Sequence, residues 1–129
     1  MKRSIWIIII GLCLTAICIL EELLVANTLT QVNQMGQQLL SLSETSEDVN
    51  TEEIYNISLE LGDFWMSREL LLCFFINYKD MNEMSNEIVK MISYSKNNIK
   101  EEFTTSLALL LYYCETFNHI TGFNIQNIL

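Results

Sequence analysis

Apolar and polar positions follow a helical period along most of this chain, which opens with a long apolar stretch. Residues 5–20 carry no charge, follow two basic residues and precede two acidic ones, after which residues 23–26 are apolar again. Crossing the core of a bilayer takes roughly 20 helical residues. The pattern therefore predicts a transmembrane anchor over residues 5–26, with Trp6 near the charged end, where interfacial aromatic residues are common.

A cleaved signal peptide and a lipoprotein leader are the alternatives to this anchor. Lipoprotein modification needs a small residue just before the modified cysteine, but leucine precedes Cys13 and isoleucine precedes Cys18. Ala16-Ile17-Cys18 matches a signal-peptidase site poorly and lies inside the apolar run. The sequence favours an uncleaved anchor and leaves cleavage as the alternative.

The distribution of charge predicts how the chain is oriented in a bacterial cell membrane. Lys2 and Arg3 precede the span, so the positive-inside rule places residues 1–4 in the cytoplasm and the C-terminal part outside the cell. Residues 21–129 hold all 16 acidic residues and 5 basic ones, hence a formal charge of −11. That charge excludes a nucleic-acid partner and argues against a domain lying flat on anionic lipid. A solvated acidic surface or a cationic partner would explain it.

Three capping signals divide the remainder of the chain into helices. Each is an Asn or Asp followed three residues later by Glu, a pair that can satisfy the free N–H groups of a first helical turn. They are Asn50 with Glu53, Asp80 with Glu83, and Asn98 with Glu101. Together with the apolar period they predict helices over residues 51–78, 81–95 and 99–117. The predicted fold class is all-α, with an N-terminal transmembrane helix that continues into a stalk and then a small antiparallel helical bundle.

The predicted domain organisation follows from these segments. Residues 27–50 form a helical stalk that ends in a polar hinge at residues 41–50, and residues 51–129 form the helical domain. Trp65 is expected in the core, and Tyr78 is placed on the inner face of the second helix. Gly122 is expected to end the fourth helix after His119. The apolar tail that follows would either fold back on the bundle or insert into a partner.

The sequence lacks the patterns that catalysis or metal binding requires. It has no Gly-rich phosphate loop and no Ser or Cys motif with a plausible histidine partner. The single histidine, His119, does not form zinc-type spacing with a cysteine. We therefore expect no enzymatic activity, no cofactor and no metal. A disulfide between Cys73 and Cys114 is left open.

Adjacent aromatic residues suggest a surface for a protein partner. Phe74–Phe75 and Tyr112–Tyr113 are neighbours, and neighbours on a helix cannot both face the core. One member of each pair is therefore expected at the surface, and the tail adds further apolar residues. The candidate partner-binding residues are Phe74, Tyr112, Phe123, Ile125, Ile128 and Leu129.

Methionines offer a second interpretation of the apolar pattern. They could belong to the core or line an adaptable groove for a small ligand. The residues concerned are Met66, Met81, Met84 and Met91.

Nearly the whole chain also resembles a known family, and residues 64–129 carry the likeness. The positions that match best are Trp65, the "FIN" of residues 75–77, His119 and the terminal "NIL". They resemble the domain of unknown function 4363 family of Gram-positive bacteria, although this chain has Tyr78 where the family tends to have histidine. The resemblance implies a short envelope protein with an N-terminal anchor and an exported helical domain, and it implies no activity.

These observations together predict a non-enzymatic, membrane-anchored helical protein outside the cytoplasm. We expect an accessory or scaffold subunit that docks onto another envelope protein. The alternative is a sensor or a module that binds a small ligand among the methionines. A hydrolase would require a cleft with converging polar groups.

Overall fold

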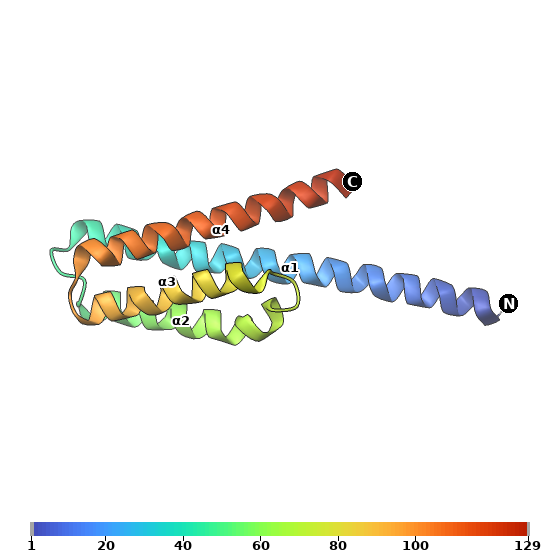
Figure 1. Cartoon of the computed structure of the whole chain (residues 1–129), viewed down its shortest axis with the longest axis horizontal. Helices are drawn as coiled ribbons and strands as arrows, with labels where there is room; N and C mark the ends of the chain where they lie inside the picture. The colour runs from blue at the N-terminus through green and yellow to red at the C-terminus, as the bar shows by residue number, and fades with distance from the viewer. Residues whose placement is uncertain (1, 129) are drawn as a thin grey trace.

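The computed structural model describes the backbone of residues 2–128 and the side chains of residues 2–117. The described residues form four helices and no strand: α1 (Lys2–Thr45), α2 (Glu52–Leu72), α3 (Tyr78–Lys96) and α4 (Lys100–Ile128). Figure 1 shows them as an elongated bundle from which the N-terminal part of α1 projects. The prediction of an all-α fold with a long apolar N-terminal helix is confirmed.

The four helices are arranged as an antiparallel bundle with short connections. α1 packs against α2 and α4, and α3 packs against the same two helices, while the backbones of the diagonal pairs do not approach each other closely in the described part of the chain. Consecutive helices therefore run in opposite directions around a common core, which is the up-down-up-down topology of four-helix bundles.

α1 serves as both the projecting helix and one wall of the bundle. Its residues are exposed as far as Leu20, and its first buried side chain is Val25. From there buried positions recur every three or four residues, as expected for a helix with one apolar face. They are Val25, Thr28, Leu29, Val32, Gly36, Leu39 and Ser43. The segment interpreted from the sequence as a stalk thus supplies a quarter of the bundle.

The polar segment 41–50 is only partly a loop. α1 continues to Thr45, and the hydroxyls in its last turns bond back to backbone carbonyls of the preceding turn. The Ser43 hydroxyl donates to the Leu40 carbonyl at 2.8 Å, and the Thr45 hydroxyl donates to the Leu42 carbonyl at 3.1 Å. The prediction of a hinge over the whole segment is wrong for residues 41–45.

The observed N-caps of α2 and α3 differ from the predicted ones. Thr51 caps α2 and accepts a hydrogen bond from the Ile54 N–H at 3.3 Å, so the prediction of Asn50 is one residue early. Asn77 caps α3 and accepts from the Lys79 N–H at 2.9 Å, which places Asp80 inside the first turn. α2 ends at Leu72, and the predicted second helix over residues 51–78 is therefore too long.

Asn98 ends α3 instead of starting α4. It has a φ of 56°, a left-handed conformation that Asn adopts more readily than most residues. Its N–H donates to the Ser95 carbonyl at 3.2 Å, and the Ile99 N–H donates to the Tyr94 carbonyl at 2.8 Å. These two bonds form a Schellman motif, a common way to end a helix.

Polar contacts between two loops close the end of the bundle farthest from the N-terminus. The fully buried Val49 donates its N–H to Asn98 Oδ1 at 2.9 Å, and its carbonyl accepts from the Ser95 hydroxyl at 2.7 Å. Asn98 Nδ2 also donates to Asp48 at 2.9 Å. Since a buried backbone group without a partner is costly, these side chains make it favourable to bury the loop.

Large side chains from all four helices fill the core. Trp65 is 1% exposed, and its indole N–H donates to the Ser85 hydroxyl at 2.8 Å. That hydroxyl in turn donates to Glu69 at 3.1 Å. The prediction that Trp65 lies in the core is confirmed. α3 contributes Met81, Met84, Ile88 and Met91, and α4 contributes Phe103, Leu107, Leu110 and Cys114.

Two helical glycines mark close approaches between helices. A Cβ atom at Gly36 would lie 2.6 Å from Leu111 Cδ2, so a larger residue there would force the Leu111 side chain on α4 to move. A Cβ atom at Gly62 would lie 2.8 Å from Ile92 Cδ1 on α3. Close packing thus accounts for glycines that cost about 1 kcal/mol each within a helix.

α4 is longer than the sequence predicts. The expected end near residue 117 and the break at Gly122 are both wrong, because α4 continues to Ile128. A single glycine weakens a helix without stopping it, and no proline follows. In Figure 1 the C-terminal part of α4 runs on toward the side where α1 leaves the bundle. The backbone therefore does not turn back at Gly122.

Candidate contact surfaces

The N-terminal part of α1 could span a membrane. It is long and apolar enough to do so, and none of its most apolar window is buried in the structure. A core helix of a soluble bundle would be mostly buried. A signal sequence would pass the same test, so cleavage remains the alternative to a lasting anchor.

Each of the two aromatic pairs has one strongly exposed member. Phe74 is 77% exposed and Phe75 is 37% exposed, while Tyr112 is 62% exposed and Tyr113 is half-buried. Phe74 lies in the turn between α2 and α3, and Tyr112 lies on α4, whose described backbone does not closely approach that of α2. The structure therefore separates these candidates into two surfaces. Binding of a partner at either one stays a prediction.

The other candidate residues belong to the C-terminal end of α4. Phe123, Ile125 and Ile128 lie on the described helical backbone, but their side chains are outside the described residues. Leu129 lies outside them entirely. Their predicted role in docking stays a prediction.

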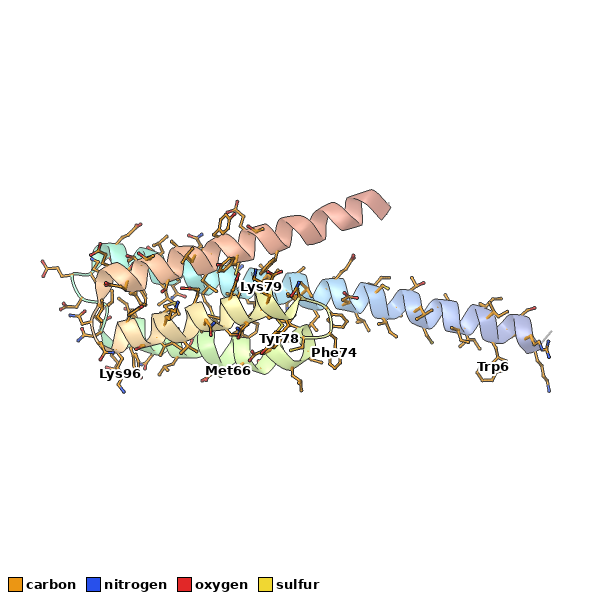
Figure 2. All side chains as sticks on the ribbon, in the orientation of Figure 1. Trp6, Met66, Phe74, Tyr78, Lys79 and Lys96 are labelled. Carbon is orange, nitrogen blue, oxygen red and sulfur yellow. The ribbon has the colours of Figure 1, made fainter. Side chains whose placement is uncertain are left out.

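The first surface, which we call the turn surface, is formed by the last turn of α2 and the start of α3. It is defined by Leu70, Leu71, Phe74, Phe75 and Tyr78, all of them exposed. Figure 2 shows Phe74 and Tyr78 near the end of the bundle from which the N-terminal part of α1 projects.

The backbone of this turn satisfies its own hydrogen bonds. The Phe74 N–H donates to the Leu71 carbonyl at 3.3 Å, and the Phe75 N–H donates to the Leu72 carbonyl at 2.9 Å. Leu72 is fully buried, and Ile76 packs against the core. Because these two residues point inward, the turn leaves its other apolar side chains at the surface.

Sequence reasoning missed Leu70 and misplaced Tyr78. The predicted second helix ran through Tyr78 and placed it on an inner face, whereas it is 76% exposed in the first turn of α3. The turn contains neither glycine nor proline, so the usual signal for a turn is missing. Asn77 with Asp80 three residues later was the signal that could have placed the start of this helix.

The second surface is a groove between α3 and α4 of about 330 Å³, which we call the α3–α4 groove. Leu109, 39% exposed, lies at its wall, and Tyr112 follows three residues later on the same side of α4. Three carboxylates and one ammonium group make the groove acidic. Its lining residues are Glu87, Lys90, Tyr94, Glu101, Glu102, Thr105, Ser106 and Leu109.

Charged side chains of α3 form an ion pair beside this groove and affect the pKa of a tyrosine on α4. Lys90 Nζ lies 3.5 Å from Glu87 Oε1 within α3. Burial raises the pKa of the Tyr113 phenol, and the Glu83 and Glu87 carboxylates raise it further, while Lys90 acts in the opposite direction. Tyr113 therefore stays neutral at physiological pH.

A further groove of about 440 Å³ lies between α1 and α4 and includes Asn33, Gln37 and Cys114 in its lining. Burial raises the pKa of the Cys114 thiol to about 12. The thiolate is the reactive form of cysteine, so this thiol is inert at neutral pH. Cys73 is exposed, and both cysteines are free in the structure, which shows no disulfide between them.

Neither a metal site nor a methionine-lined groove is formed by the side chains of residues 2–117. Within this part no three His, Cys, Asp or Glu side chains come together as metal ligands. His119 lies beyond the described side chains. Met81, Met84 and Met91 are buried in the core, whereas Met66 is 58% exposed on α2. The four methionines therefore do not line one pocket.

The fold and these surfaces define an all-α protein in which an apolar N-terminal helix continues into a four-helix bundle. The chain belongs to the family described as Domain of unknown function (DUF4363), whose match covers residues 23–128. This confirms the resemblance seen in the sequence. The matched region begins just before Val25, the first buried residue of α1, and so includes the whole bundle. No curated protein and no solved structure matches the chain.

Proposed function

We propose that this chain is a non-enzymatic, membrane-anchored helical protein that docks onto another envelope protein as an accessory or scaffold subunit. The apolar part of α1 would hold it in a bacterial cell membrane, with Lys2 and Arg3 in the cytoplasm and the bundle outside. The observation that carries the docking proposal is the exposure of Tyr112, 62%, beside the acidic α3–α4 groove.

The chemistry of this groove specifies the kind of partner. Glu87, Glu101 and Glu102 outweigh Lys90, so the groove favours a basic segment. Leu109 and Tyr112 add apolar contact area along one side, and tyrosine is a frequent anchor in protein interfaces. A helix with basic and apolar side chains on one face suits a groove between two helices.

The ligand-binding alternative has less support. It needs the methionines to surround a common space, but three of them are packed within the core and the fourth is exposed on another helix. No specific observation favours it over docking.

Tyr112→Glu should weaken docking, because it puts a negative charge beside an acidic groove and removes an exposed aromatic ring. Truncating an interface hot spot costs about 2 kcal/mol or more, which lowers affinity by more than roughly tenfold. The measurement compares, by quantitative mass spectrometry, the proteins that co-purify with the tagged full chain from native membranes in mild detergent.

Met66→Glu is the matched control. Met66 is exposed to a similar degree, 58%, and lies on α2, whose described backbone does not closely approach that of α4. The proposal predicts one or more envelope proteins that wild type and Met66→Glu retain and Tyr112→Glu loses. Equal recovery with all three chains would contradict docking at the groove.

A further inference from the structure

We infer that the turn surface rests in the interface of the lipid bilayer beside α1, so that the bundle stands end-on against the membrane. This inference rests on the proposed membrane anchor and extends it. The proposed binding partner is the lipid bilayer itself, at the boundary between its headgroups and its acyl chains.

The side chains of the turn surface are unusually exposed for their size. Leu70 is 75% exposed, Phe74 is 77% exposed and Tyr78 is 76% exposed, the three highest values among the exposed large apolar residues with described side chains, including those of the free part of α1. Residues 70–78 contain no charged residue. A contiguous apolar patch of this kind on a soluble surface marks a contact site.

The position of this surface relative to α1 favours lipid. The α2–α3 turn lies at the end of the bundle where α1 emerges (Figure 1). α1 is a single unbroken helix from Lys2 to Thr45, so its free part cannot fold away from the bundle at a hinge. Any membrane crossed by α1 must therefore lie on the side of the turn.

The length of the free part places the bundle close to the bilayer. A bilayer core of about 30 Å takes about 20 helical residues, and the uncharged run ends at Leu20, so Glu21 and Glu22 would lie at the level of the headgroups. The bundle begins at Val25, less than two helical turns after Leu20. The turn surface would then lie near the headgroups, on the side toward which the C-terminal part of α4 also runs (Figure 1).

The residue types also match a membrane interface. Phenylalanine and leucine can bury their side chains among acyl chains, while tyrosine favours the boundary, with its ring in lipid and its hydroxyl in water. Lys79 follows Tyr78 directly and is exposed, so its ammonium can reach lipid phosphates. Residues 70–78 themselves carry no charge, although Glu69 and Asp80 flank them.

Contact between the turn surface and lipid would fix the orientation of the rest of the bundle relative to the membrane. A bundle attached to the membrane through α1 alone could tilt relative to the bilayer, whereas a second contact beside α1 would restrain that tilt. The α3–α4 groove would then face sideways, toward proteins in the same membrane. This arrangement agrees with the proposed docking function and does not depend on it.

Native cysteines allow a direct test with the full chain. Cys73 is exposed and lies within the turn, and Cys13 lies within the apolar part of α1. One variant keeps Cys73 and replaces Cys13 and Cys18 with alanine, and a second keeps Cys13 alone of these three. Cys114 is buried and can stay. A third chain lacks all three and carries Glu47→Cys, which places the thiol in the exposed loop at the opposite end.

Each thiol is labelled with an environment-sensitive fluorophore in vesicles of phosphatidylcholine with some phosphatidylglycerol. Spin labels placed high or low on the acyl chains then quench the emission from probes that touch lipid. The inference predicts that the probe at Cys73 is quenched best by the shallow label and is blue-shifted. The probe at Glu47→Cys should stay accessible to aqueous iodide and unaffected by either lipid label.

The probe at Cys13 separates failure of the anchor from failure of the inference. Strong quenching by the deep label at Cys13, together with a water-exposed probe at Cys73, would overturn the inference and leave the anchor intact. An unquenched probe at Cys13 would overturn both. A probe at Cys73 that is shielded in native membranes yet exposed in the vesicles would show that a protein covers the turn, which also overturns the inference.

A double variant, Leu70→Ser with Phe74→Ser, tests whether the apolar side chains hold the turn in lipid. Both residues are exposed, so the bundle should keep its helical circular dichroism spectrum. The inference predicts that lipid quenching at Cys73 falls toward the level of the Glu47→Cys probe. Unchanged quenching with intact folding would mean that these side chains do not hold the surface in the bilayer.

Discussion

A fragment comprising residues 44–129 is expected to be unfolded, whereas one comprising residues 23–129 is expected to fold. The shorter fragment loses the part of α1 that forms a wall of the core. Val25, Leu29, Val32 and Leu39 are each 6% exposed or less. Burial of a large aliphatic side chain contributes about 1.5–3 kcal/mol, so their loss is comparable with the whole stability of about 5–15 kcal/mol that is usual for a domain.

Circular dichroism during a urea titration distinguishes the two fragments. The longer one should unfold in a single cooperative transition, and the shorter one should show little helix and no transition. Cooperative unfolding of the shorter fragment with native helix content would show that residues 51–129 form a domain without α1. The longer fragment starts at residue 23, as the family match does, so it is the natural control.

Trp65→Ala should destabilise the bundle by about 3–5 kcal/mol, the usual cost of removing a large buried aromatic ring. Trp65 is 1% exposed and packs between helices, so a cavity would remain. The substitution also removes the donor that holds Ser85, whose hydroxyl bonds to Glu69. The change in unfolding free energy is measured by urea denaturation of the 23–129 fragment.

Two control variants separate packing from hydrogen bonding. Trp65→Phe keeps an aromatic ring and loses the indole donor, so it should cost clearly less than Trp65→Ala. Met66→Ala alters the neighbouring exposed residue and should change stability by less than about 0.5 kcal/mol. If Trp65→Ala were no more destabilising than Met66→Ala, the core would be packed differently from the structure described above.

The helical core could be predicted because its periodicity is strong. Met81, Met84, Ile88 and Met91 recur at the spacing of a single helical face, and all four are buried. The buried position of Trp65 was predictable for the same reason, since a large aromatic ring on the apolar face of an amphipathic helix lies in the core. Such patterns depend on local spacing, which the sequence displays directly.

The ends of the helices were harder to predict because competing signals lie close together. Asn50 and Thr51 are both good N-caps, and only the packing of the loop selects Thr51. Asn98 is likewise a residue type favoured at N-caps, but its left-handed φ and its hydrogen bond to the buried loop place it after α3. That bond joins residues about fifty positions apart, so no local pattern contains it.

The candidate surfaces were predictable only in part. For Tyr112 and Tyr113, adjacency on a helix correctly indicated that one of the two would be exposed, whereas Phe74 and Phe75 lie in the turn after α2 and are both exposed. Adjacency could not show that Phe74 and Tyr112 lie on different surfaces, because this depends on which helices pack together. The exposure of Tyr78 could be predicted only with the knowledge that α2 ends at Leu72. The turn that follows contains no glycine or proline, so the sequence gives no usual signal for it.

The central claim is that the bundle lies outside the cytoplasm on a membrane anchor. Accessibility of a thiol in the loop between α1 and α2 tests it most directly. Glu47→Cys, in a chain whose four native cysteines are replaced, is treated with a membrane-impermeant thiol reagent on intact protoplasts. Ser4→Cys in the same background reports on the opposite side. The account predicts that Glu47→Cys is labelled on intact protoplasts and Ser4→Cys only after lysis, whereas protection of Glu47→Cys until lysis would contradict it.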